Sequence, residues 1–375
     1  MQRILAVIFF LAVFLHQSQA QCNSTNCVGP ACKCMSTSPP GGLSLANTPQ
    51  LVFLAFDGAI MATNYMDYTY LLNNSINPNG CPIEMTFFVY HEYNDYTLTH
   101  SLYFRRQEIA THSMSHSTPS SDWAYKSVSE WTDEIGGIQE ALAKFANIPK
   151  AEIRGARAPF LQSSGDATFT AMKNLGMFYD CSFPTTENTN PPVWPYTLDQ
   201  GFQHECAIPP CPKDKYPGIW TVPMVALNRN ETVCSMADAC DKPNTVDETY
   251  QYLMSNFQRH YTTSKAPFGI YLTANAWFQD AQYRLKGYKK FLDAIVVYDD
   301  VYVVPIARGL DWMKNPKPLA EVPNFFSCPT MTKTPCTNNT CYYEDDVSPV
   351  GPRNMTICVT CPDVYPWTGN PLGLP

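Results

Sequence analysis

Two histidines, His112 and His116, stand four residues apart in the segment EIATHSMSHS. At that spacing two imidazoles lie on one face of a helical turn and within reach of one metal ion. The same spacing also arises by chance or for structural reasons. Because the pair follows the strand-like EIAT, we predict a metal site at this point of the chain.

Three further polar residues end or follow apolar runs. Asp57 follows the run LVFLAF and precedes Gly58, Arg157 lies in RGARAP, and Asp180 follows MFY. In an α/β barrel, the side chains at the C-terminal ends of the strands meet in one mouth, so we expect these residues to lie near the histidines. The alternatives are a structural salt bridge for Arg157 and a capping or ion-pair role for Asp180.

The elements that must position these side chains alternate along residues 51–312. Short apolar runs are typical of buried strands, and the segments SVSEWTDEIGGIQEALAKFANI and DETYQYLMSNFQRHY carry apolar residues at helical spacing. This alternation predicts an α/β fold, a distorted or incomplete (β/α) barrel. The expected strands are LVFLAF, EMTFFVY, EIATHS, IRGARAP, MFYDCSF, IWTVPMVAL, FGIYLTA and VYVVPI.

The chain outside this alternation has a different character. The apolar run 4–15, followed by small residues at Ser18 and Ala20, predicts a secretory signal peptide, and it is too short to span a bilayer. We therefore expect four parts: the signal peptide over 1–20, a Cys-rich N-terminal extension over 21–50, the barrel domain over 51–315, and a Pro/Cys-rich tail over 316–375.

Composition indicates a secreted, disulfide-bonded glycoprotein. Fifteen cysteines in an exported chain predict disulfides, and the odd count leaves at least one thiol free or paired with another chain. The net charge of −8, without a basic run, argues against nucleic acid and anionic membranes as partners. Five N-x-S/T triplets predict glycosylation, at Asn23, Asn73, Asn230, Asn338 and Asn354.

Two tryptophans are candidates for contact with a stacking ligand such as a sugar. They are Trp194 in NPPVWPYTLD and Trp277 in LTANAWF. For a single tryptophan, packing in the core is the more frequent role.

The ordered set of segments resembles the polysaccharide deacetylases of carbohydrate esterase family 4, and most closely the chitin deacetylases of arthropods and other invertebrates. The similarity extends over nearly the whole chain after the leader and includes CNSTNCVGPACKC, TPQLVFLAFD, NPNGCPIEMTFFV, HSMSH, RAPFLQ, FYDCSF, NPPVWPYTLD, CSMADAC and DVYVVPIARGLDWMKNP. The resemblance implies a polysaccharide deacetylase-type barrel, chitin or another N-acetylglucosamine polysaccharide as partner, and zinc or another divalent metal as cofactor.

The resemblance also implies roles for individual residues. His112 and His116 are the metal ligands, Asp57 is the general base that takes a proton from the attacking water, and Arg157 orients that base. The predicted substrate-binding residues are Pro159, Phe160, Asp180, Trp194 and Trp277.

Two positions depart from the family pattern. The family has adjacent aspartates at the end of its first strand, a base and then a metal ligand, whereas here Gly58 follows Asp57. The family also has a general-acid histidine shortly before a late tryptophan, and no histidine lies between Gly269 and Trp277. A metal would therefore be bound weakly or not at all. The possible substitutes are Thr273, Asn275 and Asp280, as a weaker proton donor or a late ligand, and His91 and His100, which would reach the site from a loop.

We therefore predict a secreted chitin deacetylase-like protein that binds chitin in an extracellular matrix, such as a cuticle, gut lining or shell, with deacetylation lost or strongly weakened. One alternative is an active, metal-dependent chitin deacetylase that hydrolyses the acetamide of N-acetylglucosamine units through a rearranged site. The other is a structural or inhibitory secreted protein without a sugar ligand.

Overall fold

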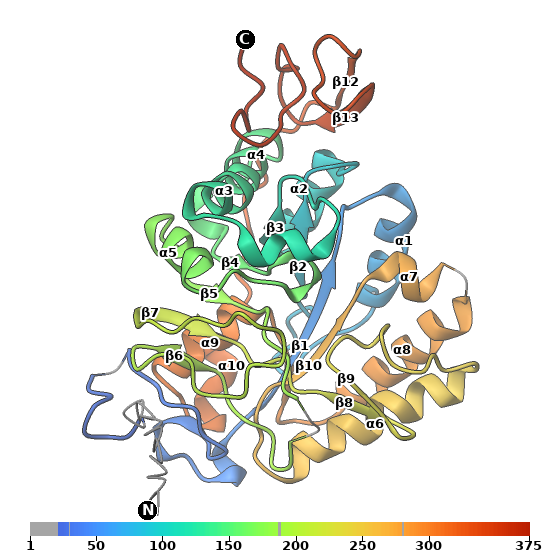
Figure 1. The fold of residues 1–375 in the computed structure, drawn as a ribbon. Helices are drawn as coiled ribbons and strands as arrows, with labels where there is room; N and C mark the ends of the chain where they lie inside the picture. Colours follow the sequence, from blue (N-terminus) through green and yellow to red (C-terminus); the bar gives the residue numbers. More distant parts are fainter. Residues whose placement is uncertain (1–21, 30, 187–188, 280) are drawn as a thin grey trace, which may run out of the picture.

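The computed structural model describes residues 22–29, 31–186, 189–279 and 281–375. The predicted signal peptide lies outside the described residues. Among the described helices, none is both long enough and apolar enough to cross a membrane. Figure 1 shows the N-terminal extension and the C-terminal tail at opposite ends of the molecule, with the sheet and its helices between them.

A single large sheet forms the centre of the fold. Strand β1 (Gln50–Asp57) pairs in parallel with β10 (Phe268–Leu272), β11 (Val301–Val303) and β2 (Thr86–Tyr90). From β2 the sheet continues in parallel through β3 (Glu108–Ser113), β4 (Gly155–Ala156), β5 (Tyr179–Asp180) and β7 (Tyr216–Thr221), and ends with the antiparallel strand β6 (Tyr196–Leu198). The two ends of the sheet do not pair, so the predicted incomplete barrel is confirmed.

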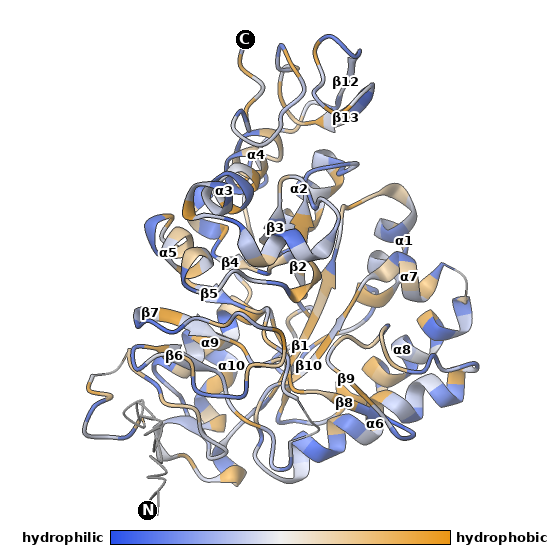
Figure 2. Cartoon of the chain, viewed as in Figure 1, coloured by the Kyte–Doolittle hydropathy of each residue, from blue (hydrophilic) through white to orange (hydrophobic). Residues whose placement is uncertain are grey.

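Strand β1 is buried on both faces, as a central parallel strand must be. Its residues alternate between two apolar clusters: Val52, Leu54 and Phe56 belong to one, and Leu51, Phe53 and Ala55 to the other. Hydrophobic residues dominate the central strands, whereas α6 and α8 carry hydrophilic residues at the periphery (Figure 2). Because side chains alternate along a strand, Asp57 belongs to the face of Leu51, Phe53 and Ala55.

Helices follow most of the strands and cover the sheet. The segment predicted to be helical after His116 forms α3 (Val128–Trp131), a π-helical turn (Thr132–Gly136) and α4 (Gly137–Phe145), and the later prediction corresponds to α6 (Val246–Thr262). The remaining helices are α1 (Ala62–Leu72), α2 (Tyr96–Phe104), α5 (Asp166–Asn174), α7 (Ala274–Phe278), α8 (Gln282–Ile295), α9 (Ile306–Lys314) and α10 (Val322–Phe325).

Disulfides tie both terminal segments, as the cysteine content predicts. The N-terminal segment is closed by Cys22–Cys34 and Cys27–Cys32. The tail forms the hairpin of β12 (Asn339–Tyr343) and β13 (Arg353–Ile357), held by Cys336–Cys358 and Cys341–Cys361. The other bridges are Cys81–Cys328, Cys206–Cys211 and Cys234–Cys240. Only Cys181 is free, and it is buried, so the sequence-based option of a disulfide to a second chain through the odd cysteine is not supported.

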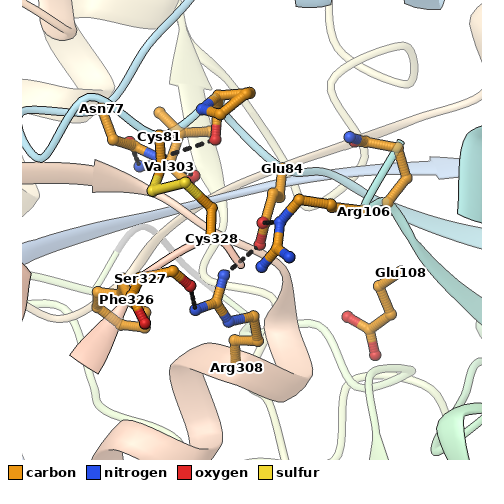
Figure 3. A network of polar contacts seen from close by, with 12 residues as sticks. Asn77, Cys81, Glu84, Arg106, Glu108, Val303, Arg308, Phe326, Ser327 and Cys328 are labelled. Carbon is orange, nitrogen blue, oxygen red and sulfur yellow. Dashed lines mark hydrogen bonds and ion pairs between the residues drawn. A yellow bond between two sulfur atoms is a disulfide. The ribbon is translucent and has the colours of Figure 1, made fainter. Parts of the chain in front are cut away.

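A polar network at the N-terminal ends of β2 and β3 anchors the start of the tail (Figure 3). The buried Glu84 carboxylate accepts hydrogen bonds from Arg106 Nε and Arg308 Nη1, both at 2.6 Å. The same arginines donate to the backbone carbonyls of Pro329 and Ser327. Together with the neighbouring Cys81–Cys328 bridge, this network fixes residues 327–329 to the base of the sheet.

Candidate functional site

A cavity of about 350 Å³ opens at the C-terminal ends of β1, β2 and β3. Its lining combines a small polar set with several apolar and aromatic side chains. It is lined by Asp57, Gly58, Tyr90, His112, His116, Phe160, Leu161, Met236 and Thr273. The structure therefore brings together the predicted metal ligands, the predicted base and Phe160.

Asp57 is held by a fully buried arginine. Arg157 Nη1 donates to Asp57 Oδ1 at 2.5 Å, and its Nε donates to the Cys181 carbonyl at 2.6 Å. The guanidinium lies over the rings of Phe88 and Tyr271, at 4.1 and 4.8 Å from their centroids. Burial raises the pKa of the Asp57 carboxyl, and the charge of Arg157 opposes that rise. The arrangement fixes a carboxylate oxygen at the cavity wall, as a hydrogen-bond acceptor or proton acceptor requires.

His112 has the tautomer that a metal ligand or a hydrogen-bond acceptor needs. It lies near the end of β3, and its Nδ1 is 2.9 Å from the Arg157 carbonyl oxygen. A carbonyl only accepts, so Nδ1 carries the proton and the Nε2 lone pair remains available. Burial lowers the pKa of His112 to about 3, so the ring is neutral at physiological pH.

His116 lies in the loop after β3, and the predicted helical turn for the two histidines is wrong. The strand continues through Ser113, and His116 has a positive φ of 43°. The backbone N–H of His116 donates to Ser113 Oγ at 3.0 Å, which fixes this turn. The two imidazole centroids are nevertheless 5.0 Å apart, and burial lowers the pKa of His116 to about 4.

These residues do not supply the ligand set of a catalytic zinc, which has three protein ligands and one open position. Two imidazoles are present, but Asp57 is bound to Arg157, and Gly58 offers no ligand atom. Within the described ranges, the groups of three or more His, Cys, Asp or Glu ligand atoms within 4.8 Å of one another are Cys22, Cys27 and Cys34, and His100, Cys336 and Cys358. All of these cysteines form disulfides, and neither group includes a residue of the cavity.

Of the two described substitutes for the missing acid, one lines the cavity and the other does not. Thr273 lines it at the end of β10, and its backbone N–H donates to Asp238 Oδ2 at 3.0 Å. Asn275, on α7, accepts a hydrogen bond from Gln279 just after that helix and is not among the lining residues. Asp280 lies outside the described residues.

His91 and His100 do not reach the site from a loop, so that expectation is wrong. Both are buried, and their Nδ1 atoms are engaged by the Tyr96 hydroxyl at 2.6 Å and the Ala146 carbonyl at 2.8 Å. Tyr96 and Ala146 lie on the side of the fold that the tail covers. There the backbone N–H of Cys358, in the tail, donates to the Phe145 carbonyl at 2.8 Å.

Four of the predicted substrate-binding residues do not line the cavity. Pro159 is buried at the start of the turn that carries Phe160. Asp180 is buried at the end of β5, where Ser182 Oγ donates to it at 2.6 Å and burial raises its pKa to about 6. Trp194 donates to the Ser264 carbonyl in the core, and Trp277 packs at 0% exposure against Phe278 and Tyr288.

Sequence reasoning missed four residues that shape the cavity. Tyr90, Leu161 and Met236 line it, and Asp238 lies behind Thr273 with a pKa that burial and the nearby Asp57 charge raise. Tyr90 ends the predicted strand EMTFFVY, so its position at a C-terminal strand end is the signal that would have identified it. Leu161 ends a 3-10 turn, and Met236 and Asp238 lie in a loop, so no strand end marks them; their one signal is that they fall in RAPFLQ and CSMADAC, two segments of the family resemblance.

The chain is similar over nearly its whole length to two curated proteins of Bombyx mori. It is 40% identical over 367 residues to chitin deacetylase 8, covering 94% of this chain and 93% of the relative. It is 32% identical over 371 residues to chitin deacetylase 1, covering 94% of this chain and 68% of the relative. No protein-family model matches the chain.

Among solved structures, the fold is similar to that of a polysaccharide deacetylase from Mycobacterium smegmatis. The TM-score is 0.50 at 14% identity, covering 80% of this chain and 99% of that one. At this identity the similarity supports the fold class alone.

Proposed function

Because the chain belongs to the chitin deacetylases, within the polysaccharide deacetylases of carbohydrate esterase family 4, we propose that it is a secreted chitin-binding protein whose deacetylation is lost or strongly weakened. The polymer is chitin or a related N-acetylglucosamine polysaccharide of an extracellular matrix. The observation that carries the proposal is the cavity itself, which has kept two neutral histidines and Asp57 bound to Arg157, while the described residues place neither a third metal ligand nor a general acid there.

The loss of chemistry follows from what the remaining groups can do. Zinc in a catalytic site polarises a carbonyl and activates water, and it needs three protein ligands beside one open position. Among the described residues, Asp57 is the one carboxylate that lines the cavity, and it is bound to Arg157. Removal of a general acid alone costs about 10² to 10⁴ in rate.

The cavity keeps the features that suit sugar binding. Its volume of about 350 Å³ lies at the lower end of the range for ligand pockets. Phe160 is 40% exposed at the rim, where its ring is available to the apolar face of a sugar. Asp57 and the neutral imidazoles supply acceptors for hydroxyl and amide hydrogens.

Secretion and glycosylation are supported by independent features. The predicted leader precedes a chain in which fourteen cysteines form seven disulfides, a pattern of oxidising compartments. The asparagines of all five predicted glycosylation triplets are exposed, as modification requires. Neither nucleic acid nor a membrane is a proposed partner, in keeping with the net charge of −8.

A second candidate function is residual, metal-dependent deacetylation. The favouring observation is the His112 tautomer, which leaves Nε2 available in the manner of a metal ligand. In this case a divalent metal held by His112 and His116 would supply the Lewis acid, while Asp57 would accept the proton from water.

One experiment separates these functions. The purified glycoprotein is incubated with chitin beads and with N-acetylglucosamine oligomers, each with zinc or with a chelator, and bound protein and released acetate are measured. We expect retention on the beads under both conditions and no acetate above the blank. Zinc-dependent acetate release would establish the second function, and absence from the beads under both conditions would contradict both.

A further inference from the structure

The cavity wall beside Gly58 is formed by Tyr90, the last residue of β2. Gly58 has a φ of +128°, a backbone conformation that residues with side chains rarely adopt. A Cβ placed on Gly58 would lie 3.8 Å from Tyr90 Cε1, in van der Waals contact with the ring. The carboxylate of an aspartate at this position would therefore lie next to the Tyr90 ring.

Tyr90 packs against both histidines. Its ring centroid lies 4.9 Å from that of His116 and 6.3 Å from that of His112. Strands β1 and β2 are neighbours with Asp57 opposite Phe88, and Tyr90, two residues further along β2, brings its ring to 3.8 Å from the Cβ position of Gly58. The ring therefore stands between the end of β1 and the two histidines.

The Tyr90 ring belongs to a group of three rings along one side of the cavity. The His116 ring contacts Tyr90 and also Phe160, with a centroid distance of 4.6 Å to the latter. We call Tyr90, His116 and Phe160 the aromatic wall. Such rings offer stacking surface to the C–H face of a sugar and to an acetyl methyl group.

We propose that Tyr90 has taken the place of the missing metal ligand, so that Gly58 and Tyr90 together exclude a catalytic metal and complete an aromatic wall that contacts an N-acetylglucosamine unit directly. The identity of the sugar rests on the proposed function, whereas the exclusion of metal rests on the geometry of residues 58 and 90. Restoring the carboxylate at position 58 is therefore insufficient to rebuild the metal site while the ring remains.

The test is a zinc titration by calorimetry of the full glycoprotein and its variants. We expect no histidine-dependent zinc binding in the native protein or in Gly58→Asp. The double variant Gly58→Asp/Tyr90→Ser should bind one zinc at least about tenfold more tightly than Gly58→Asp alone. The matched control Gly58→Asp/Tyr90→Phe keeps the ring and should behave like Gly58→Asp, and His112→Ala should abolish the site in the Tyr90→Ser double variant.

Two outcomes would overturn the exclusion of metal. One is zinc binding by Gly58→Asp as tight as that of the Tyr90→Ser double variant, because the ring would then be no obstacle. The other is a zinc site in the native protein that Tyr90→Phe removes, because the phenol oxygen would then be a ligand itself.

A second measurement is independent of the backbone strain at position 58. Tyr90→Phe and Tyr90→Ser are compared, in the native background, for affinity toward an N-acetylglucosamine oligomer. Tyr90→Phe should stay within about twofold of the native value, and Tyr90→Ser should lose about fivefold or more. Equal affinities of the two variants would contradict the proposal that the Tyr90 ring contacts the sugar. If the native protein itself does not bind the oligomer, the proposed function fails while the zinc result stands separately.

Discussion

The two edges of the parallel sheet each carry a buried carboxylate bound by arginine, but only one of the two networks is completed by protein groups. At the base, Glu84 is bound by Arg106 and Arg308, whose remaining donors reach backbone carbonyls of the tail. At the cavity, Asp57 is bound by Arg157 alone, beside two neutral imidazoles. A network completed by protein fixes the chain, whereas one left open at a cavity leaves acceptors for a ligand.

The largest effect is expected from breaking the pair at the cavity. Arg157→Met leaves the buried Asp57 carboxylate and the Cys181 carbonyl without their donor, which should destabilise the fold by about 3 to 5 kcal/mol. Urea unfolding measures this change. The double variant Asp57→Leu/Arg157→Met removes both charges and should recover a large part of the loss; equal stability of the single and double variants would contradict the pairing argument.

A smaller loss of stability is expected at the base. Glu84→Gln removes the charge that two arginines share, but those side chains are 19% and 27% exposed, so water compensates in part. We expect a loss of about 1 to 2 kcal/mol in the free energy of unfolding. Sugar affinity should not change, because this network lies at the opposite end of the strands. A change of more than about threefold in oligomer affinity would contradict the claim that the Glu84 network stabilises the fold without contributing to sugar binding.

For Phe160, at the rim of the cavity, we expect the reverse of the result for Glu84→Gln: sugar affinity should fall while stability hardly changes. Because its ring is 40% exposed, Phe160→Ala should leave the free energy of unfolding within about 0.5 kcal/mol of the native value. Affinity for an N-acetylglucosamine oligomer should fall about three- to tenfold through loss of stacking. Calorimetry with the oligomer measures the second effect, and unchanged affinity would remove Phe160 from the binding surface.

The smallest effect is expected for a surface ion pair that belongs to neither network. Lys150 and Glu140 form a salt bridge with side chains 48% and 41% exposed. Lys150→Ala should change the unfolding free energy by less than about 0.5 kcal/mol, since exposed pairs contribute little. Thermal unfolding at low and high salt measures this change, and the larger changes at the two networks are compared with it.

The sequence predicted the fold and the main cavity residues for the same physical reason. Apolar runs such as LVFLAF indicate buried strands, and polar residues at strand ends must meet at one edge of a parallel sheet. Asp57 and His112 come together in this way, and Arg157 reaches Asp57 from just beyond β4. The family resemblance added roles that spacing alone does not contain.

The failures have physical reasons too. The positive φ of His116 depends on a turn fixed by Ser113, which a helical spacing rule does not consider. Trp194 and Trp277 pack in the apolar core. The sequence alone does not distinguish a tryptophan that packs in a core from one that stacks on a sugar. Tyr90 ends a predicted strand, so the strand-end rule applies to it as well, but its contact with Gly58 is visible only in the structure.

The most direct test is the affinity of the native protein for an N-acetylglucosamine oligomer, measured by calorimetry in chelator and again in zinc, with acetate assayed in the same samples. We predict the same dissociation constant in both solutions and no acetate release. Binding that appears only with zinc, or acetate that accumulates with it, would contradict the conclusion that this cavity binds sugar without a metal.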